Sequence, residues 1–92
     1  MKTLMIVDVI ALDKTKLAEY SALAAGTLQA FSGHFIAKGA IEVIHGDAAF
    51  QSKAVIEFPD KESAKNWYNS AEYQAIIPLR EQAINSQFHL IS

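Results

Sequence analysis

Several ionisable side chains fall in segments whose composition is typical of β-strands. Asp8 interrupts one apolar run, and Glu57 lies near the end of another. His34 and Lys38 lie in the run between them. Two carboxylates beside an ammonium group in a partly dry site shift their pKa values and can act as general acid or base. Glu57 or His34 would then transfer a proton, while Lys38 and Arg80 would hold negative charge. The alternative is a neutralised ion-pair cluster that only keeps two sheets from sliding.

The segment NWYNSAEYQAIIPLR, residues 66–80, concentrates aromatic rings and the only arginine of the chain. Trp67 falls on the apolar side of a predicted helix, which favours core packing over ligand contact. Tyr73 continues this apolar side, and its hydroxyl needs a partner if it is buried. Arg80 could bind an anion through two hydrogen bonds, or it could face solvent. Together with Asp8, these three side chains are the predicted ligand contacts.

Composition excludes several classes of function. The 92 residues carry a formal net charge of −2 and no basic stripe, so nucleic acid is not an expected partner. Cysteine is absent, and the histidines lie on separate elements without metal-ligand spacing, so neither a metal nor a cofactor is expected. Asp8 interrupts the apolar N-terminal run, and no run is long enough to span a membrane. We therefore expect a cytoplasmic protein that does not associate with membranes.

Hydrophobic periodicity predicts a single domain, residues 1–92. The expected strands are 3–12, 34–46, 50–58 and 87–92, and the expected helices are 14–31, 59–69 and a last helical stretch within 70–83. Asp13, Ser70 and Pro78 supply helix start signals, and Gly39 is the expected position of a bulge. The order β-α-β-β-α-β predicts an α+β, ferredoxin-like fold with a four-stranded antiparallel sheet.

Side-chain alternation divides the predicted sheet into two faces. One face is apolar and should carry the helices: Met5, Val7, Val9, Phe35, Ala37, Ala54, Ile56, Phe58, Phe88 and Leu90. The other is mixed: Leu4, Ile6, Asp8, Ile10, His34, Ile36, Lys38, Val55, Glu57, Gln87, His89 and Ile91. In the usual strand order 4-1-3-2 of this fold, Asp8 neighbours Glu57 and Glu57 neighbours Lys38. An exposed apolar patch usually marks an interface, so we expect a homodimer whose sheets pack face to face.

Two stretches, SGHFIAKGAIEVIHGD and AVIEFPDKESAKNWYNSAEYQAIIPLREQA, carry a family resemblance. They resemble the bacterial family known as domain of unknown function 1330 over nearly the whole chain, most specifically at VIEFPD and WYNSAEYQ…PLR. The resemblance implies a dimeric α+β barrel. The positions that match the family pattern are Gly33, Lys38 (more often arginine in the family), Gly39, Gly46, Glu57, Phe58, Tyr68, Ser70, Tyr73, Gln74 and Arg80.

Three positions depart from the family pattern. His45 stands where the family tends to have glutamate, Ala48 where it has tryptophan, and Asn85 where it often has aspartate. Haem-degrading monooxygenases are among the related barrels, and Asn66 and Trp67 loosely match their asparagine and tryptophan. Their axial histidine has no counterpart in this chain, so the resemblance does not imply haem chemistry. It also implies no general activity.

Two functions stay open at the level of sequence. The first is the binding of a small, partly apolar, anionic or carbonyl-bearing molecule in a pocket between sheet and helices. The second is a cofactor-independent enzyme, isomerase-like or monooxygenase-like, with Glu57 or His34 as the proton-transfer group.

Overall fold

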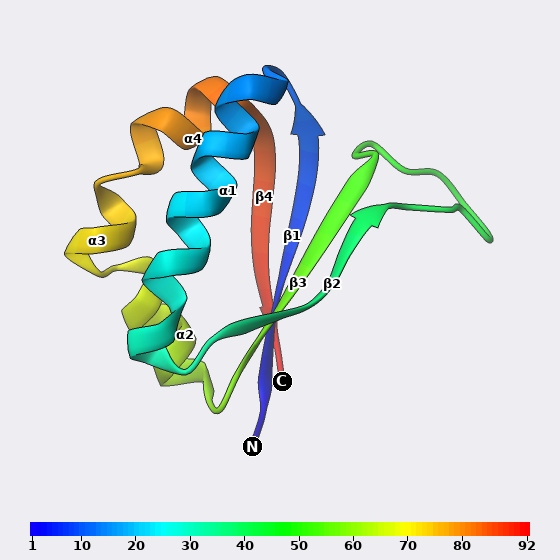
Figure 1. Cartoon of the computed structure of the whole chain (residues 1–92). Helices are drawn as coiled ribbons and strands as arrows, with labels where there is room; N and C mark the ends of the chain where they lie inside the picture. Colours follow the sequence, from blue (N-terminus) through cyan, green and yellow to red (C-terminus); the bar gives the residue numbers. More distant parts are fainter.

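The computed structural model describes residues 1–92 as one antiparallel sheet with all helices packed on one of its faces (Figure 1). The elements are β1 (Thr3–Ala11), α1 (Lys14–Leu28), η1 (Gln29–Phe31), β2 (His34–Ala40), β3 (Ser52–Phe58), α2 (Lys61–Tyr68), α3 (Ala71–Gln74), α4 (Ile77–Ala83) and β4 (Ile84–Ile91). The strand order is β2-β3-β1-β4. The predicted ferredoxin-like α+β fold and its strand order are confirmed.

The predicted helix start signals are all confirmed. Asp13 accepts a hydrogen bond from the Lys16 backbone N–H at 3.0 Å and so caps α1. Ser70 accepts one from the Tyr73 backbone N–H at 3.2 Å and caps α3. Pro78 lies in the first turn of α4, where its missing N–H costs no helical hydrogen bond. Ser70 and Pro78 divide the segment after α2 into two further short helices, which lie on the same side of the sheet as α1 (Figure 1).

Two strand boundaries differ from the prediction by three residues or more. Strand β2 ends at Ala40 instead of continuing to residue 46, because its ladder with β3 ends at the pair of Ala40 and Ser52. Residues 41–51 form a connection that extends away from the helices (Figure 1), with Gly46 at a positive φ of 87°. Strand β4 begins at Ile84, three positions before the predicted start, because Ile84 is buried and pairs with Ala11.

The core lies between the helices and the apolar face of the sheet. On α1, the buried residues Tyr20, Ala24 and Leu28 recur every four residues and form an apolar stripe that packs into this core. Its largest fully buried side chains are Trp67, Tyr73 and Phe58, all from the second half of the chain. Burying side chains of this size contributes about 1.5–3 kcal/mol each, so the site-bearing helices are held mainly by this aromatic cluster.

A bulge in β2 changes which residues lie on which face. The register shifts between Phe35, which pairs with Ile56, and Ala37, which pairs with Val55. Ala37 therefore lies on the face without helices, and Lys38 lies on the helix-covered face. The sequence prediction for these two residues was wrong, because it assumed unbroken alternation through residue 36 and expected the bulge at Gly39.

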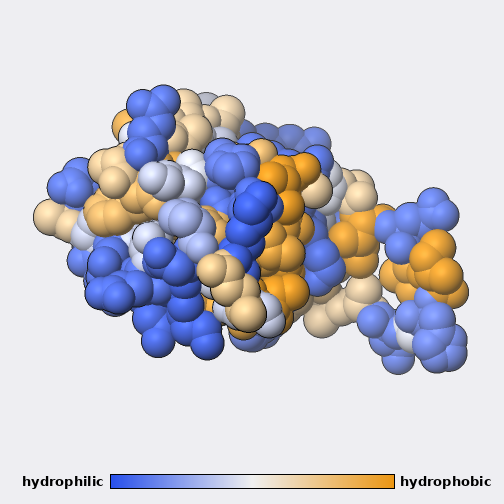
Figure 2. Space-filling model, turned by 90° about the horizontal axis from the view of Figure 1, so that it is seen from below, coloured by the Kyte–Doolittle hydropathy of each residue, from blue (hydrophilic) through white to orange (hydrophobic).

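The face of the sheet opposite the helices, called the open face below, carries apolar rows. Leu4, Ile6 and Ile10 are only partly buried there, and the Ile91 residue is 54% exposed. Viewed from below, hydrophobic side chains gather in a band and again on the 41–51 connection, where Ile44 is 88% exposed (Figure 2). A single chain thus leaves an apolar surface uncovered.

Candidate functional site

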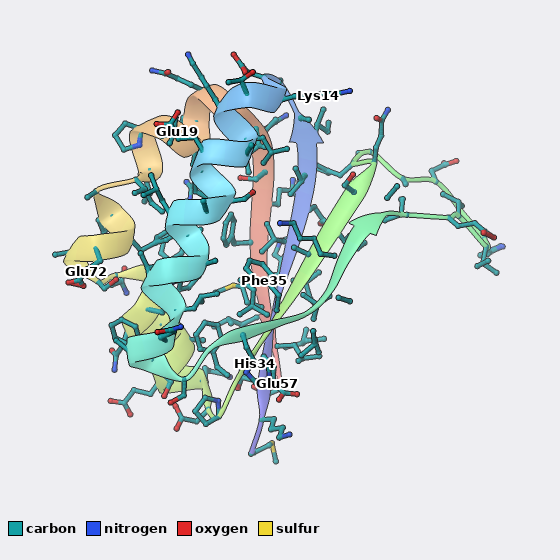
Figure 3. All side chains as sticks on the ribbon, in the orientation of Figure 1. Lys14, Glu19, His34, Phe35, Glu57 and Glu72 are labelled. Carbon is teal, nitrogen blue, oxygen red and sulfur yellow. The ribbon has the colours of Figure 1, made fainter.

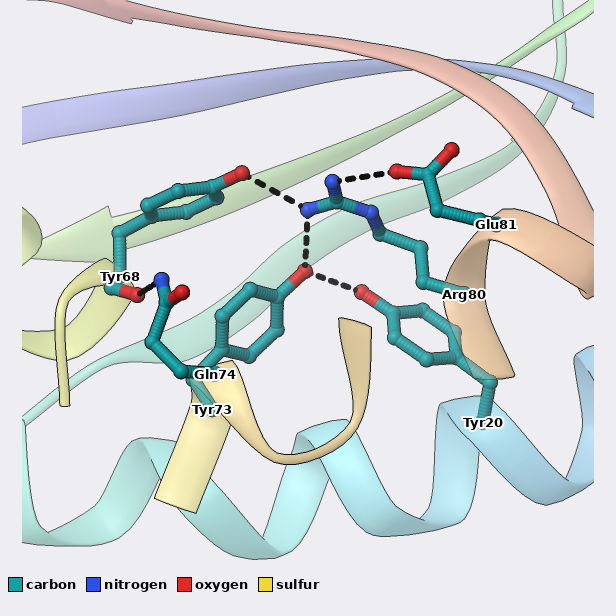
Figure 4. A network of polar contacts seen from close by, with 6 residues as sticks. All are labelled: Tyr20, Tyr68, Tyr73, Gln74, Arg80 and Glu81. Carbon is teal, nitrogen blue, oxygen red and sulfur yellow. Dashed lines mark hydrogen bonds and ion pairs between the residues drawn. The ribbon is translucent and has the colours of Figure 1, made fainter. Parts of the chain in front are cut away.

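The guanidinium of Arg80 lies at the centre of a buried polar network on the helix-covered side of the sheet (Figure 4). Arg80 is only 8% exposed. Its Nη1 donates to the hydroxyl of Tyr68 at 2.9 Å and to that of Tyr73 at 3.2 Å. The Tyr73 hydroxyl is joined to that of Tyr20 at 2.6 Å, and Arg80 Nη2 donates to Glu81 Oε1 at 2.7 Å. The network therefore ties α1, α2, α3 and α4 together.

Short helices and a surrounding set of rings position this guanidinium. Tyr68 ends α2, and its backbone carbonyl accepts a hydrogen bond from Gln74 Nε2 at 2.7 Å. The Arg80 guanidinium lies 5.1 Å from the ring centre of Phe88 and 5.7 Å and 5.9 Å from those of Tyr68 and Tyr73. Ring faces attract cations electrostatically, so these aromatic side chains offset part of the desolvation of the charge.

Burial sets the protonation states within the network. Desolvation raises the pKa of Tyr20, and the adjacent Tyr73 raises it further. Desolvation also raises the pKa of Tyr73, although hydrogen bonds from Tyr20 and Arg80 act in the opposite direction. For Arg80, desolvation opposes the charge, but the hydrogen bonds to Glu81, Tyr68 and Tyr73 outweigh it and raise the pKa. A cation thus faces two neutral buried phenols at neutral pH.

A pocket of about 410 Å³ opens beside this network, between α2, α4 and the sheet, and is called the Arg80 pocket below. Its polar lining residues are Lys65, Tyr68, Asn69, Arg80 and Ser86. Its apolar lining residues are Met5, Phe88 and Leu90. No carboxylate lines the pocket. Its wall therefore contains hydrogen-bond donors and positive charge as well as apolar side chains.

The predicted cluster of Asp8, Glu57 and Lys38 does not form. Asp8 pairs across the sheet with Lys53 and makes an ion pair with it. Glu57 lies at the far end of β3, opposite Leu4, and the bulge places Lys38 on the other face, with its ammonium 5.3 Å from the ring centre of Phe35. The prediction was wrong because it used strand order without register.

His34 and Glu57 do come together, on the open face (Figure 3). His34 Nε2 lies 3.3 Å from Glu57 Oε1, and Lys2 Nζ lies at the same distance from that oxygen. The sheet separates this pair from Arg80 and Lys38, so the four residues do not share one site. The hypothesis that they act together in one reaction is not supported by this geometry.

Among the predicted ligand contacts, Arg80 lines the pocket, whereas Trp67 and Tyr73 are packed in the core. Trp67 is 1% exposed, and its indole N–H donates to Thr27 Oγ1 at 2.9 Å. Tyr73 is 0% exposed and reaches the site only through its hydroxyl, which accepts from Arg80. Asp8 lies on the open face, away from the Arg80 pocket.

Sequence reasoning missed most of the pocket lining. Lys65, Tyr68 and Asn69 are spaced by three and four residues, so they share one side of α2 and its C-terminal end. Ser86, which lines the pocket next to Phe88 and Leu90, follows the two-residue period of a strand. These periodicities were visible in the sequence, but nothing in it showed that the two sets meet.

The structure holds no group of three or more histidine, aspartate or glutamate side chains close enough together to ligate a metal ion. None of its helices has both the length and the apolar character that crossing a bilayer requires.

The chain matches the family described as domain of unknown function (DUF1330) across residues 2–92. The protein belongs to the DUF1330 family. No curated protein matches its sequence. The resemblance seen in the sequence motifs is therefore confirmed.

Solved structures with the same fold include proteins with and without an assigned activity. A protein of unknown function from Rhodopseudomonas palustris has a TM-score of 0.79 at 14% identity, covering 98% of this chain and 80% of its own. A dimeric ferredoxin-like protein of unknown function from Jannaschia sp. CCS1 has a TM-score of 0.77 at 11% identity, covering 100% and 99%. SnoaB, a cofactor-independent oxygenase from Streptomyces nogalater, has a TM-score of 0.71 at 11% identity, covering 99% and 91%. At these identities the likeness establishes the fold alone.

Proposed function

We propose that this DUF1330 protein binds a small, partly apolar, anionic or carbonyl-bearing molecule in the Arg80 pocket. The observation that carries the proposal is the buried guanidinium of Arg80 at the wall of a cavity that no carboxylate lines. A buried charge is costly, and proteins keep one where it is paired or where it serves a function.

The charges around Arg80 leave room for an incoming anion. Its one carboxylate contact is Glu81, whose side chain is 63% exposed and therefore well screened by water. Arg80 Nε is buried and has no hydrogen-bond acceptor in the protein. Lys65 adds a second positive charge to the pocket wall. A ligand oxygen near the guanidinium would gain charge-assisted hydrogen bonding, which is roughly twice as strong as that between neutral groups.

The apolar part of the pocket defines the other half of the ligand. Met5, Phe88 and Leu90 contribute side chains from neighbouring strands to a surface without charge. A cavity of about 410 Å³ falls at the lower end of the range typical of small-molecule sites, which suits a molecule of one or two rings.

The test compares 2-naphthoate with its uncharged amide, 2-naphthamide, by nitrogen-15 NMR titration. Arg80 is the only arginine and Trp67 the only tryptophan, so each gives a single side-chain N–H signal. We expect the carboxylate to bind at least about tenfold more tightly than the amide. Arg80→Met should abolish this preference, whereas Lys53→Met, which removes the same charge from the open face, should preserve it. Equal affinity for the two probes would contradict the proposal.

We also infer that the protein is a homodimer formed through its open faces. The support is the row of apolar side chains on that face, with Leu4, Ile6 and Ile10 only partly buried and Ile91 54% exposed, together with the dimeric ferredoxin-like proteins of the same fold. Ile6 lies in the middle of β1, between Val55 on β3 and His89 on β4. In light scattering coupled to size exclusion, Ile6→Glu should give a monomer. Leu23→Glu, on the outer side of α1, should stay dimeric, and a monomeric wild type would refute the inference.

We propose acid–base catalysis as a second candidate function, because His34 Nε2 and Glu57 Oε1 lie 3.3 Å apart on the open face. In a dimer, the partner sheet would shield this pair from water, which is the setting for general acid–base chemistry. The pair would act without Arg80, since the sheet separates them. Deuterium uptake into 2-indanone, a ketone with acidic C–H bonds, tests for such a base. Catalysed uptake that is lost in Glu57→Gln and kept in Lys53→Met would support an enzyme, and uptake equal in all three proteins would exclude this base.

A further inference from the structure

The hydroxyl of Tyr68 differs from the other two phenols of the network in where its proton can go. A guanidinium has donors only, so in the 2.9 Å contact with Arg80 Nη1 the Tyr68 oxygen must accept. The phenolic proton of Tyr68 is therefore not used in that contact. Arg80 is the only hydrogen-bond partner that the structure gives the Tyr68 hydroxyl.

The other two phenol hydroxyls, of Tyr20 and Tyr73, form a hydrogen bond with each other. The hydroxyls of Tyr20 and Tyr73 are 2.6 Å apart, and neither residue lines the Arg80 pocket. Tyr68, in contrast, lines the pocket and is partly buried. It is thus the one tyrosine with both a proton to donate and access to a bound molecule.

Packing fixes the Tyr68 ring before any ligand arrives. The ring meets Phe88 edge-on at 5.5 Å between centroids, and it lies 6.2 Å from the Trp67 ring and 5.2 Å from the Tyr73 ring. Its backbone is held by the hydrogen bond from Gln74. A donor that is already immobilised loses little conformational entropy on binding, which raises both affinity and selectivity.

We propose that Tyr68 determines ligand specificity by donating its phenolic proton to a carboxylate oxygen, while Arg80 supplies the compensating charge. The ligand class is then carboxylic acids with a flat apolar body, such as aryl or unsaturated acids, and the proposal rests on the proposed function of the pocket. Tyr68, Arg80 and Lys65 all line the pocket and can all donate hydrogen bonds, so an acceptor-only group fits and an amine does not.

The experiment measures 2-naphthoate binding to the wild type, Tyr68→Phe and Tyr20→Phe, using the Arg80 Nε–H signal. Tyr68→Phe removes only the hydroxyl that faces the pocket, and loss of a hydrogen bond to a charged group should weaken binding by roughly tenfold to a hundredfold. Its affinity for 2-naphthamide should fall much less. Tyr20→Phe removes a phenol of the same network outside the pocket and should bind 2-naphthoate like the wild type.

The outcomes separate the two proposals. If the wild type binds 2-naphthoate and Arg80→Met does not, but Tyr68→Phe binds normally, the role of Tyr68 is overturned and the pocket stands. If the wild type does not bind 2-naphthoate, the pocket proposal fails and takes the role of Tyr68 with it. Should Tyr68→Phe not fold, wild-type protein labelled with 3-fluorotyrosine replaces it. Its three fluorine signals should then include one that 2-naphthoate moves, and three unmoved signals would contradict the proposal.

Discussion

The two faces of the sheet handle charge in different ways. On the helix-covered face, Arg80 is buried and held by two phenols and the rings around them. On the open face, the ion pairs lie at the surface of a single chain, with the Lys53 side chain 46% exposed and that of Lys2 74% exposed. A hydrogen-bonded charge among rings has one geometry, whereas exposed ion pairs can rearrange. The first arrangement suits a preformed ligand site, and the second suits a surface that another copy covers.

The largest effect is expected when an isoleucine is replaced by alanine on each face of the sheet in turn. Ile56 is 3% exposed against the helices, and Ile91 is 54% exposed on the open face. Ile56→Ala should lower the free energy of unfolding by about 2–5 kcal/mol, because it leaves a cavity in the core. Ile91→Ala should cost less, because Ile91 lies at the end of β4 and its truncation leaves no cavity in the core of the chain. Urea denaturation of both variants at one protein concentration measures the difference, and equal losses would show that the faces are packed alike.

The next effect contrasts the two kinds of charge. Arg80→Met removes the donor of both phenol contacts and should cost about 1–3 kcal/mol, since the Tyr68 and Tyr73 oxygens lose a charged partner. Lys53→Met breaks the surface pair with Asp8 and should cost about 0–1 kcal/mol. The same denaturation experiment gives both values. A larger cost for Lys53→Met would contradict the view that the buried charge of Arg80 contributes more to stability than the exposed ion pair.

The buried phenols of the helix-covered face should make stability depend on pH in the alkaline range. Burial raises the pKa of Tyr20 and Tyr73 above the usual value of about 10 for an exposed tyrosine. The unfolded chain therefore releases these protons first, so their contribution to stability is complete below about pH 10 and is lost as the pH rises above it. Urea midpoints from about pH 8 to about pH 11 should fall.

Tyr20→Phe is the matched variant for this titration. It removes the hydroxyl bonded to Tyr73 and should cost about 0.5–1.5 kcal/mol at neutral pH. Its urea midpoints should also fall less steeply at alkaline pH than those of the wild type, because the variant lacks the Tyr20 hydroxyl and its raised pKa. Identical slopes for the two proteins would mean that Tyr20 ionises as easily in the folded state as in the unfolded state.

The sequence was sufficient for the fold and for the helix-covered face, because both follow from local signals. Caps at Asp13 and Ser70 and the stripe on α1 depend on neighbouring residues along the chain. Arg80 was recognised as a candidate ligand contact from its chemistry. Its surroundings were not, because the meeting of Lys65 and Ser86 in one pocket depends on how α2 packs across β4.

The open face was predicted less well because it depends on register. The strand order was right, but the position of each residue along its strand was not considered, so Asp8 was placed beside Glu57 and not opposite Lys53. One irregularity then moved Lys38 to the other face, because a bulge after Phe35 reverses the alternation for every later residue of β2.

The smallest expected effect tests this reversal directly, through a double-mutant cycle of Lys38→Met and Glu57→Gln. On opposite faces of the sheet, the two side chains share no partner, so their effects on the free energy of unfolding should add within about 0.5 kcal/mol. His34→Gln and Glu57→Gln form the matched cycle on the open face, where a contact of 3.3 Å joins the two side chains. That cycle should show a larger coupling than the first. A coupling between Lys38 and Glu57 that equals or exceeds the one between His34 and Glu57 would place Lys38 on the open face after all. It would also restore the cluster that strand order alone suggested.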